Sequence, residues 1–185
     1  MVGIKKKMNN KLRVIEAVFR TKILGVNERK ELENICIGRG ADIGCGGKKI
    51  TKECIGVDLY GKGELGEYGS QKGVKSAATH KSEGGCLPFF ENDELDFIVS
   101  CHNLEHFKHP LEPLLEWKMV VRKGGNIGVI VPDDSKVDSI NLDKTHKVAF
   151  TLKSLIELFD EAGLKIIDYG VALKNWSIFL IAEKT

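Results

Sequence analysis

The sequence predicts a doubly wound α/β fold whose seven-stranded sheet is mostly parallel and has an antiparallel last strand. Short apolar runs typical of strands alternate along the 185 residues with amphipathic segments typical of helices, which is the pattern of a parallel sheet. The last two apolar runs are joined by a short loop, and such a loop can connect only antiparallel neighbours. The two runs around 41–58 end at a glycine turn and at a carboxylate, as in folds that bind a nucleoside.

Each element rests on a local signal. Apolar residues at helical spacing predict a helix over 9–24, which either covers the mouth of a pocket or packs on the sheet edge. Pro110 can begin a second helix, and Thr151 and Gly163 fit the cap and the C-terminal stop of a third. The predicted strands are 35–43, 54–58, 75–80, 95–100, 126–131, 165–170 and 177–182.

Composition excludes several classes of protein. The formal net charge is +2, so the chain has no basic footprint for nucleic acid. No apolar run approaches the roughly 18 residues that a membrane span needs, and no signal peptide is evident at the N-terminus. The five cysteines are scattered, as in a reducing compartment, so we expect a cytoplasmic protein. We divide the chain into an N-terminal helical extension, 1–30, and one α/β domain, 31–185.

The glycine turn differs from a dinucleotide site. Asp42 is followed by Gly44, Cys45 and Gly46, and no third glycine stands at the spacing of a pyrophosphate-binding turn. A carboxylate two residues before the first glycine would attract an ammonium group and repel a pyrophosphate. Asp58, after the next apolar run, is placed to accept from ribose hydroxyls.

Further motifs follow this turn in a fixed order. They read L-P-F at 87–89, L-D-F-I-V-S at 95–100, L-E-H at 104–106, V-R-K-G-G at 121–125, and F-T and A-G-L at 150–151 and 162–164. Together with D-x-G-x-G they resemble class I S-adenosylmethionine-dependent methyltransferases of the small-molecule type, including those of quinone biosynthesis. The resemblance implies a Rossmann-like fold and S-adenosylmethionine as the cofactor.

Cofactor contacts are implied residue by residue. Asp42 would lie near the methionine ammonium, and Asp58 would bind both ribose hydroxyls. The resemblance also assigns the methionine moiety to the turn and to the end of the fourth strand, and adenine to the segment before 87. The remaining cofactor-binding residues are Gly44, Cys45, Gly46, Glu83, Gly84, Ser100 and Cys101.

Two departures from the family pattern leave a rival open. Lys48 stands where a further glycine is common, and Gly46 to Asp58 spans only 58 − 46 = 12 positions, so any helix between the first two strands must be short or irregular. A binding or regulatory module without catalysis is therefore the alternative function. A nicotinamide oxidoreductase is disfavoured by the turn spacing and by Asp42.

Histidines supply the candidate bases. His102 and His146 are expected on the substrate side, where an imidazole could take a proton from an oxygen acceptor. We therefore expect O-methylation of a small-molecule acceptor. The sequence leaves open the identity of this acceptor and the oligomeric state of the protein. His102, Glu105 and His106 are close enough for a metal, but the L-E-H motif accounts for them without one. Carboxylates at 133–134 fit a capped turn better than a metal site, so we expect no metal.

Overall fold

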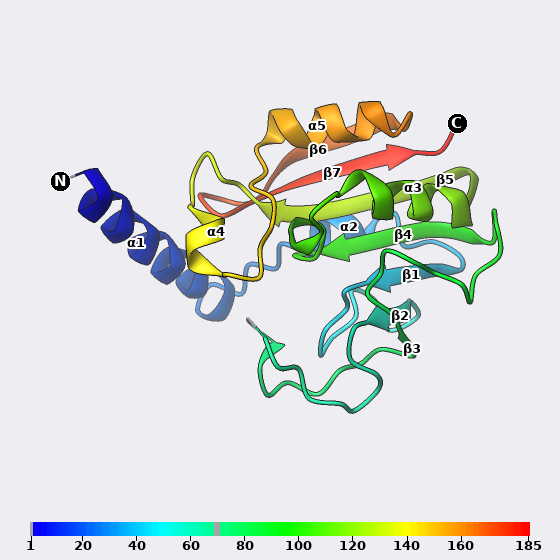
Figure 1. The fold of residues 1–185 in the computed structure, drawn as a ribbon, viewed down its shortest axis with the longest axis horizontal. Coiled ribbons are helices and arrows are strands. Elements are labelled where there is room, and N and C mark those ends of the chain that lie inside the picture. Colours follow the sequence, from blue (N-terminus) through cyan, green and yellow to red (C-terminus); the bar gives the residue numbers. More distant parts are fainter. Residues whose placement is uncertain (1, 69–70) are drawn as a thin grey trace.

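The computed structural model describes residues 2–68 and 71–185, with side chains from residue 9 onward. Its seven-stranded sheet has the order β3-β2-β1-β4-β5-β7-β6 (Figure 1). All neighbours pair in parallel except β7, which is antiparallel to both β5 and β6. The predicted fold class is thus confirmed. The strands are β1 Gly40–Ile43, β2 Ile55–Asp58, β3 His80–Lys81, β4 Leu95–Cys101, β5 Val121–Pro132, β6 Lys165–Leu173 and β7 Ser177–Glu183.

One face of the sheet is covered by α3, Leu111–Val120, and α5, Leu152–Glu161 (Figure 1). α3 packs on β5, and α5 packs on β6 and β7. Thr151 caps α5 through a capping box with Ser154, and Gly163 follows the helix at φ +64°. The larger apolar core lies between these helices and the sheet, with Trp117 and Phe159 fully buried in it.

The opposite face is covered less fully. Leu32 of α2, Lys30–Glu33, is completely buried against Phe97, Val99 and Ile130. α1, Val2–Lys22, extends from the body of the molecule (Figure 1). Asn10 joins α1 to the segment before α4, Ser139–Leu142, because its side chain exchanges two hydrogen bonds with the main chain of Asp138. No helix in the described part of the chain is long and apolar enough to cross a membrane.

Three local predictions need correction. The first strand covers only the end of 35–43, because Gly38 turns at φ +90° and the amide of Arg39 donates to Asp96 Oδ2 at 2.7 Å instead of joining a ladder. The third strand begins at His80, since Lys75 pairs in an isolated bridge with Leu65. Between β1 and β2 the described chain forms turns and bends, with no helix at all. Parallel β1, β2 and β4 nevertheless end at the same edge of the sheet, where an open α/β fold binds its ligand.

Candidate functional site

A cavity of about 990 Å³ lies at this edge of the sheet. Its wall combines the glycine turn, the end of β2, the loop after β4, the inner side of α1 and the segment 132–147. Ala17 and Thr21 of α1 are among the lining residues, so the N-terminal helix covers the pocket instead of packing only on a sheet edge. The volume is at the upper end of the range for ligand sites, which suits a cofactor with a small second substrate.

The glycine turn is held by the neighbouring strand. The amides of Gly44 and Cys45 donate to the carbonyl of Val57 at 2.8 and 3.2 Å. Gly44 and Gly46 have φ values of +72° and +58°, which a residue with a side chain adopts only under strain. The turn therefore requires both glycines.

Asp58 fixes the end of β2 against this turn. Its Oδ2 accepts the amide of Gly46 at 2.8 Å, and its Oδ1 accepts the amide of Tyr60 at 3.1 Å. The residue also lines the cavity. A carboxylate has about four acceptor positions, so each oxygen retains one for a ligand hydroxyl. This arrangement fits the pair of ribose hydroxyls expected from the sequence.

The predicted site residues fall into two groups. Those that line the cavity are Gly44, Asp58, Glu83, Cys101, His102 and His146. Those that lie behind the lining are Asp42, Cys45, Gly46, Gly84 and Ser100. The structure thus brings one part of the expected site together at the wall, and places the other part in the layer that supports it.

Residues of the second group are engaged with the protein. Asp42 Oδ2 accepts the amide of Ile50 at 2.6 Å, and burial raises the pKa of Asp42 to about 7 against the opposing effect of that hydrogen bond. Ser100 Oγ donates to the carbonyl of Ile43 at 2.8 Å. The amide of Gly84, proposed for the adenine ring, donates to Ser82 Oγ at 3.1 Å. Their roles toward the cofactor remain predictions.

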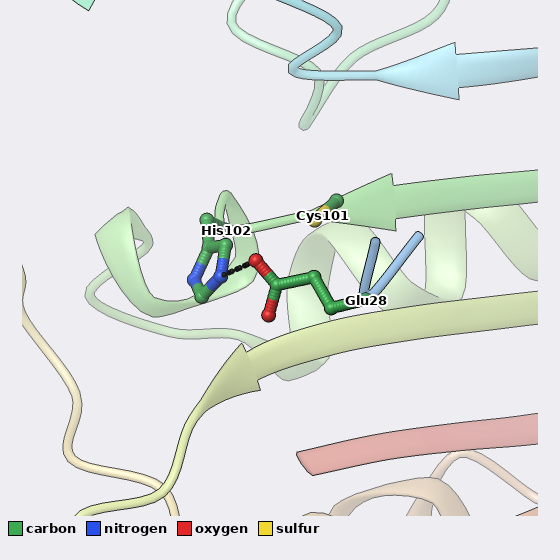
Figure 2. A group of neighbouring side chains, drawn as sticks. All are labelled: Glu28, Cys101 and His102. Atoms are coloured by element: carbon green, nitrogen blue, oxygen red, sulfur yellow. Dashed lines mark hydrogen bonds and ion pairs between the residues drawn. The ribbon is translucent and has the colours of Figure 1, made fainter. Parts of the chain in front are cut away.

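His102 lies directly after β4 in a left-handed conformation, φ +54°, which is uncommon for a residue other than glycine. Figure 2 shows the carboxylate of Glu28 turned toward its imidazole, with Cys101 at the strand end beside them. Glu28 Oε1 is 3.1 Å from His102 Nε2. The other carboxylate oxygen of Glu28 accepts a short hydrogen bond from Ser177 Oγ.

Glu28 and His102 shift each other's pKa in opposite directions. Burial opposes the charge on His102, but the carboxylate of Glu28 outweighs it and holds the His102 pKa well above its ordinary value. Burial likewise opposes the charge of Glu28, yet His102 keeps the Glu28 pKa below its ordinary value. The two side chains thus form an ion pair at neutral pH. His146 differs, since burial lowers its pKa.

The other histidines are arranged differently from the sequence expectation. Residues 104–106 form a 3₁₀ turn, so His102 and His106 do not share an α-helical face. His106 instead packs edge to face against His146, with ring centroids 4.8 Å apart, beside the buried Glu105. The carboxylates at 133–134 accept from Ser135 and Ser139, as expected of a capped turn.

Sequence reasoning missed three residues of the site. Glu28 is 74 positions from His102 and carries no local motif. Gln71 Oε1 accepts the amide of Gly47 at 3.2 Å and covers the glycine turn. Asn103 lies so close to Gly44 that a Cβ there would meet its Cγ at 2.5 Å. The loop position of Asn103, directly after a strand end, is the one signal that could have indicated it.

Comparison with known proteins finds a methyltransferase domain in the chain. A family model described as a methyltransferase domain matches residues 41–129, which include β1, β2, β4 and most of β5. An uncharacterised protein of Methanocaldococcus jannaschii is 30% identical over 141 residues, which are 70% of this chain and 66% of that protein. The chain thus spans slightly less than two thirds of the length of this relative.

Solved structures share the fold. An S-adenosylmethionine-dependent methyltransferase from Aquifex aeolicus has a TM-score of 0.61 at 14% identity, and the match covers 96% of this chain and 98% of that one. An S-adenosylmethionine-dependent methyltransferase from Thermotoga maritima has a TM-score of 0.62 at 16% identity, and the match covers 96% of this chain and 99% of that one. The protein bound by the Haloferax volcanii methyltransferase activator Trm112 has a TM-score of 0.65 at 12% identity, and the match covers 95% of this chain and 97% of that one.

The strand order and the glycine turn agree with these matches. Residues 41–129 form a methyltransferase domain, and the chain has the fold of the class I S-adenosylmethionine-dependent methyltransferases. S-adenosylmethionine is the methyl donor of these methyltransferases. The strand order of the sheet, with β7 antiparallel between β5 and β6, differs from the 3-2-1-4-5-6 order of dinucleotide dehydrogenases.

Proposed function

We propose that this chain transfers the methyl group of S-adenosylmethionine to a hydroxyl of a small-molecule acceptor. The observation that carries the proposal is a single cavity with two chemically different walls. Gly44, Asp58 and Glu83 line the side next to β1 and β2, and His102 and His146 line the side next to α4. A donor and an acceptor held in one cavity can react without diffusing together.

The chain's own residues would do three things in this reaction. Asp58 would hold the ribose through the acceptor positions that Gly46 and Tyr60 leave free. Bound S-adenosylmethionine supplies an electrophilic methyl group on its sulfonium. α1 and the segment 132–147 would exclude water from the acceptor. Of the two expected bases, His146 would take the proton of the acceptor hydroxyl, because burial lowers its pKa, whereas His102 is already protonated in its ion pair with Glu28.

Small acceptors fit this proposal better than macromolecules. Asn10 and Asp138 bind α1 to the segment before α4, and both of these parts of the chain contribute residues to the cavity wall, so the wall on the acceptor side is held together. The near-neutral charge balance gives no surface for a polyanion. We also propose that 1–30 acts as a covering extension of the catalytic unit 31–185, in the cytoplasm as its cysteine usage suggests.

One observation favours the alternative of a binding module. The β1–β2 connection has no helix, and Gln71 rests against the glycine turn, where a Cβ on Gly46 would meet its Oε1 at 2.6 Å. Cofactor binding therefore requires Gln71 to share or leave this space.

Calorimetry with S-adenosylhomocysteine and with NAD tests the class. We expect binding of the first alone; the reverse result contradicts the proposal. Transfer of a labelled methyl group from S-adenosylmethionine to a metabolite extract then tests catalysis. Binding without any labelled product would support the binding module instead. In a parallel reaction with a whole-cell extract, labelled macromolecules without labelled small molecules would contradict the acceptor class.

A further inference from the structure

A second group of side chains lies on the acceptor side of the cavity. Glu105, His106 and His146 each offer one ligand atom, and these atoms lie within 4.8 Å of one another. All three residues line the cavity. Neither the family match nor the similar structures assign a role to this group.

The carboxylate of Glu105 is the unusual member. The residue is completely buried, and neither of its oxygens has a hydrogen-bond partner among the residues that the structure describes. His102 Nδ1 and His146 Nε2 lie 3.5 and 3.8 Å from Oε1, longer than a well-formed hydrogen bond. Among the described side chains, the only charge beside this carboxylate is thus that of His102, which Glu28 shares. Burying a carboxylate whose oxygens accept no hydrogen bond is costly, so native proteins usually give such a group a further cation or donor.

His146 has a similar deficit. Its Nδ1 is buried without a hydrogen-bond partner in the described part of the chain. His146 and Glu105, each with a side-chain atom that lacks a hydrogen bond to any described residue, therefore meet from two segments that are distant in sequence. His146 Nε2 and Glu105 Oε1 are 3.8 Å apart, which is too far for a hydrogen bond, and such a bond would in any case leave His146 Nδ1 without a partner.

Main-chain bonds hold this arrangement in place. The carbonyl of Glu105 accepts the amides of Lys147 at 2.8 Å and Val148 at 3.1 Å. These bonds fix the loop that carries His146 against the 3₁₀ turn that carries Glu105 and His106. The backbone thus positions these side chains, in addition to the ring contact between His106 and His146.

We propose that Glu105, His106 and His146 form a binding site for one divalent transition-metal ion, with an open coordination position toward the cavity. Two imidazoles and one carboxylate suit Zn²⁺, Mn²⁺, Fe²⁺ or Co²⁺, whereas Mg²⁺ and Ca²⁺ prefer oxygen ligands alone. Three protein ligands with one free position are typical of sites at which a metal contacts substrate. A metal here would bind the oxygen of the methyl acceptor, and this role rests on the proposed function.

The neighbouring group of Glu28, Cys101 and His102 is the competing location. Its carboxylate already bonds to His102 and Ser177, so it has no comparable deficit. Cys101 is the distinguishing residue, because a thiolate bound to Co²⁺ gives an intense charge-transfer absorption that nitrogen and oxygen ligands lack.

The test uses the full chain, freed of metal by a chelator and titrated with Co²⁺, Zn²⁺, Mn²⁺ and Mg²⁺. We expect one equivalent of Co²⁺ to bind with visible absorption and no sulfur band, and Zn²⁺ and Mn²⁺ to compete for it. Glu105→Gln and His146→Ala should each weaken binding by at least about tenfold, the smallest loss expected even for supporting residues. His109→Ala, an exposed histidine of the same loop, and Cys101→Ser should bind as the wild type does.

Several outcomes would overturn the site. They are no binding to the metal-free wild type, equal binding in Glu105→Gln and His146→Ala, loss in Cys101→Ser, or equal competition by Mg²⁺. If Glu105→Gln does not fold, His106→Ala replaces it. Thermal unfolding gives a second measurement, because a metal that binds the folded state raises the midpoint in the wild type and not in the variants. Calorimetry of the metal-free protein with S-adenosylhomocysteine reports on the proposed function separately.

Discussion

The carboxylate of Asp58 accepts the backbone amide of Gly46 at 2.8 Å and so links the end of β2 to the glycine turn after β1. Tyr60 donates its amide to the other oxygen. The residue expected to hold the ribose therefore also holds the loop that should face the methionine moiety. Substitution of Asp58 should affect both halves of the cofactor site.

We expect Asp58→Ala to weaken S-adenosylhomocysteine binding by about 1.5 to 3 kcal/mol, the range for hydrogen bonds to a charged group. Asp58→Asn should also lose affinity, since its amide NH₂ must face the N–H of Gly46 or Tyr60. Calorimetry measures both, with the exposed Glu157→Ala on α5 as the control. Unchanged affinity in folded Asp58→Ala would remove this residue from the site.

The glycine turn allows a matched comparison. Gly46→Val should abolish S-adenosylhomocysteine binding while leaving the far-ultraviolet circular dichroism nearly unchanged, because a side chain meets Gln71 and the backbone requires φ +58°. Gly63→Ala carries the same backbone strain, φ +80°, but no atom lies within 4 Å of its new Cβ. This control should bind normally. Binding retained by Gly46→Val would place the cofactor elsewhere.

Asp42 makes stability depend on pH. Its folded-state pKa, about 7, lies above its ordinary value of 3.8, so the folded protein retains a proton that the unfolded chain releases. The stabilising contribution is complete below pH 3.8 and is lost as pH rises toward 7, by up to about 4 kcal/mol. Chemical denaturation at pH 5 and pH 8 should show a smaller decrease in Asp42→Asn than in the wild type. The exposed Asp160→Asn should behave as the wild type; an Asp42→Asn profile that matches it too would contradict the assignment.

Glu28 and His102 should be coupled energetically. Removing either partner of this partly buried pair leaves the other without its counter-charge, so Glu28→Ala and His102→Ala should each lower the free energy of unfolding by about 1.5 to 3 kcal/mol. The double variant should lose less than the sum of the single losses, as a double-mutant cycle measures. Additive losses would mean that the two side chains do not interact in solution.

His146 should matter for transfer more than for cofactor binding. Once an acceptor is known, His146→Ala should lower turnover by about 10²- to 10⁴-fold, with S-adenosylhomocysteine affinity changed by a small factor. His109→Ala is the control. Activity that survives chelation but needs His146 would assign it as a base, whereas activity lost with the metal would assign it as a ligand. Full activity in His146→Ala would exclude both roles.

Local sequence signals predicted much of the fold because they depend on neighbours along the chain. The N-cap at Thr151, the glycine after α5 and the alternation of strands and helices were all confirmed. Predictions failed where a long-range contact replaced a local preference. Arg39 bonds to Asp96, 57 positions away, and so the first strand is shorter than its apolar run.

The sequence by itself determined the class of the protein, the sheet and the residues that form the glycine turn and end β2, since these are encoded within short segments. Only the tertiary structure decided which distant side chains meet. Glu28 reaches His102 and Ser177 across 74 and 149 positions, and the loop of His146 is attached to Glu105 through main-chain bonds. No periodicity or spacing encodes such contacts, because they arise when the strands align their ends and bring separate loops to one edge of the sheet.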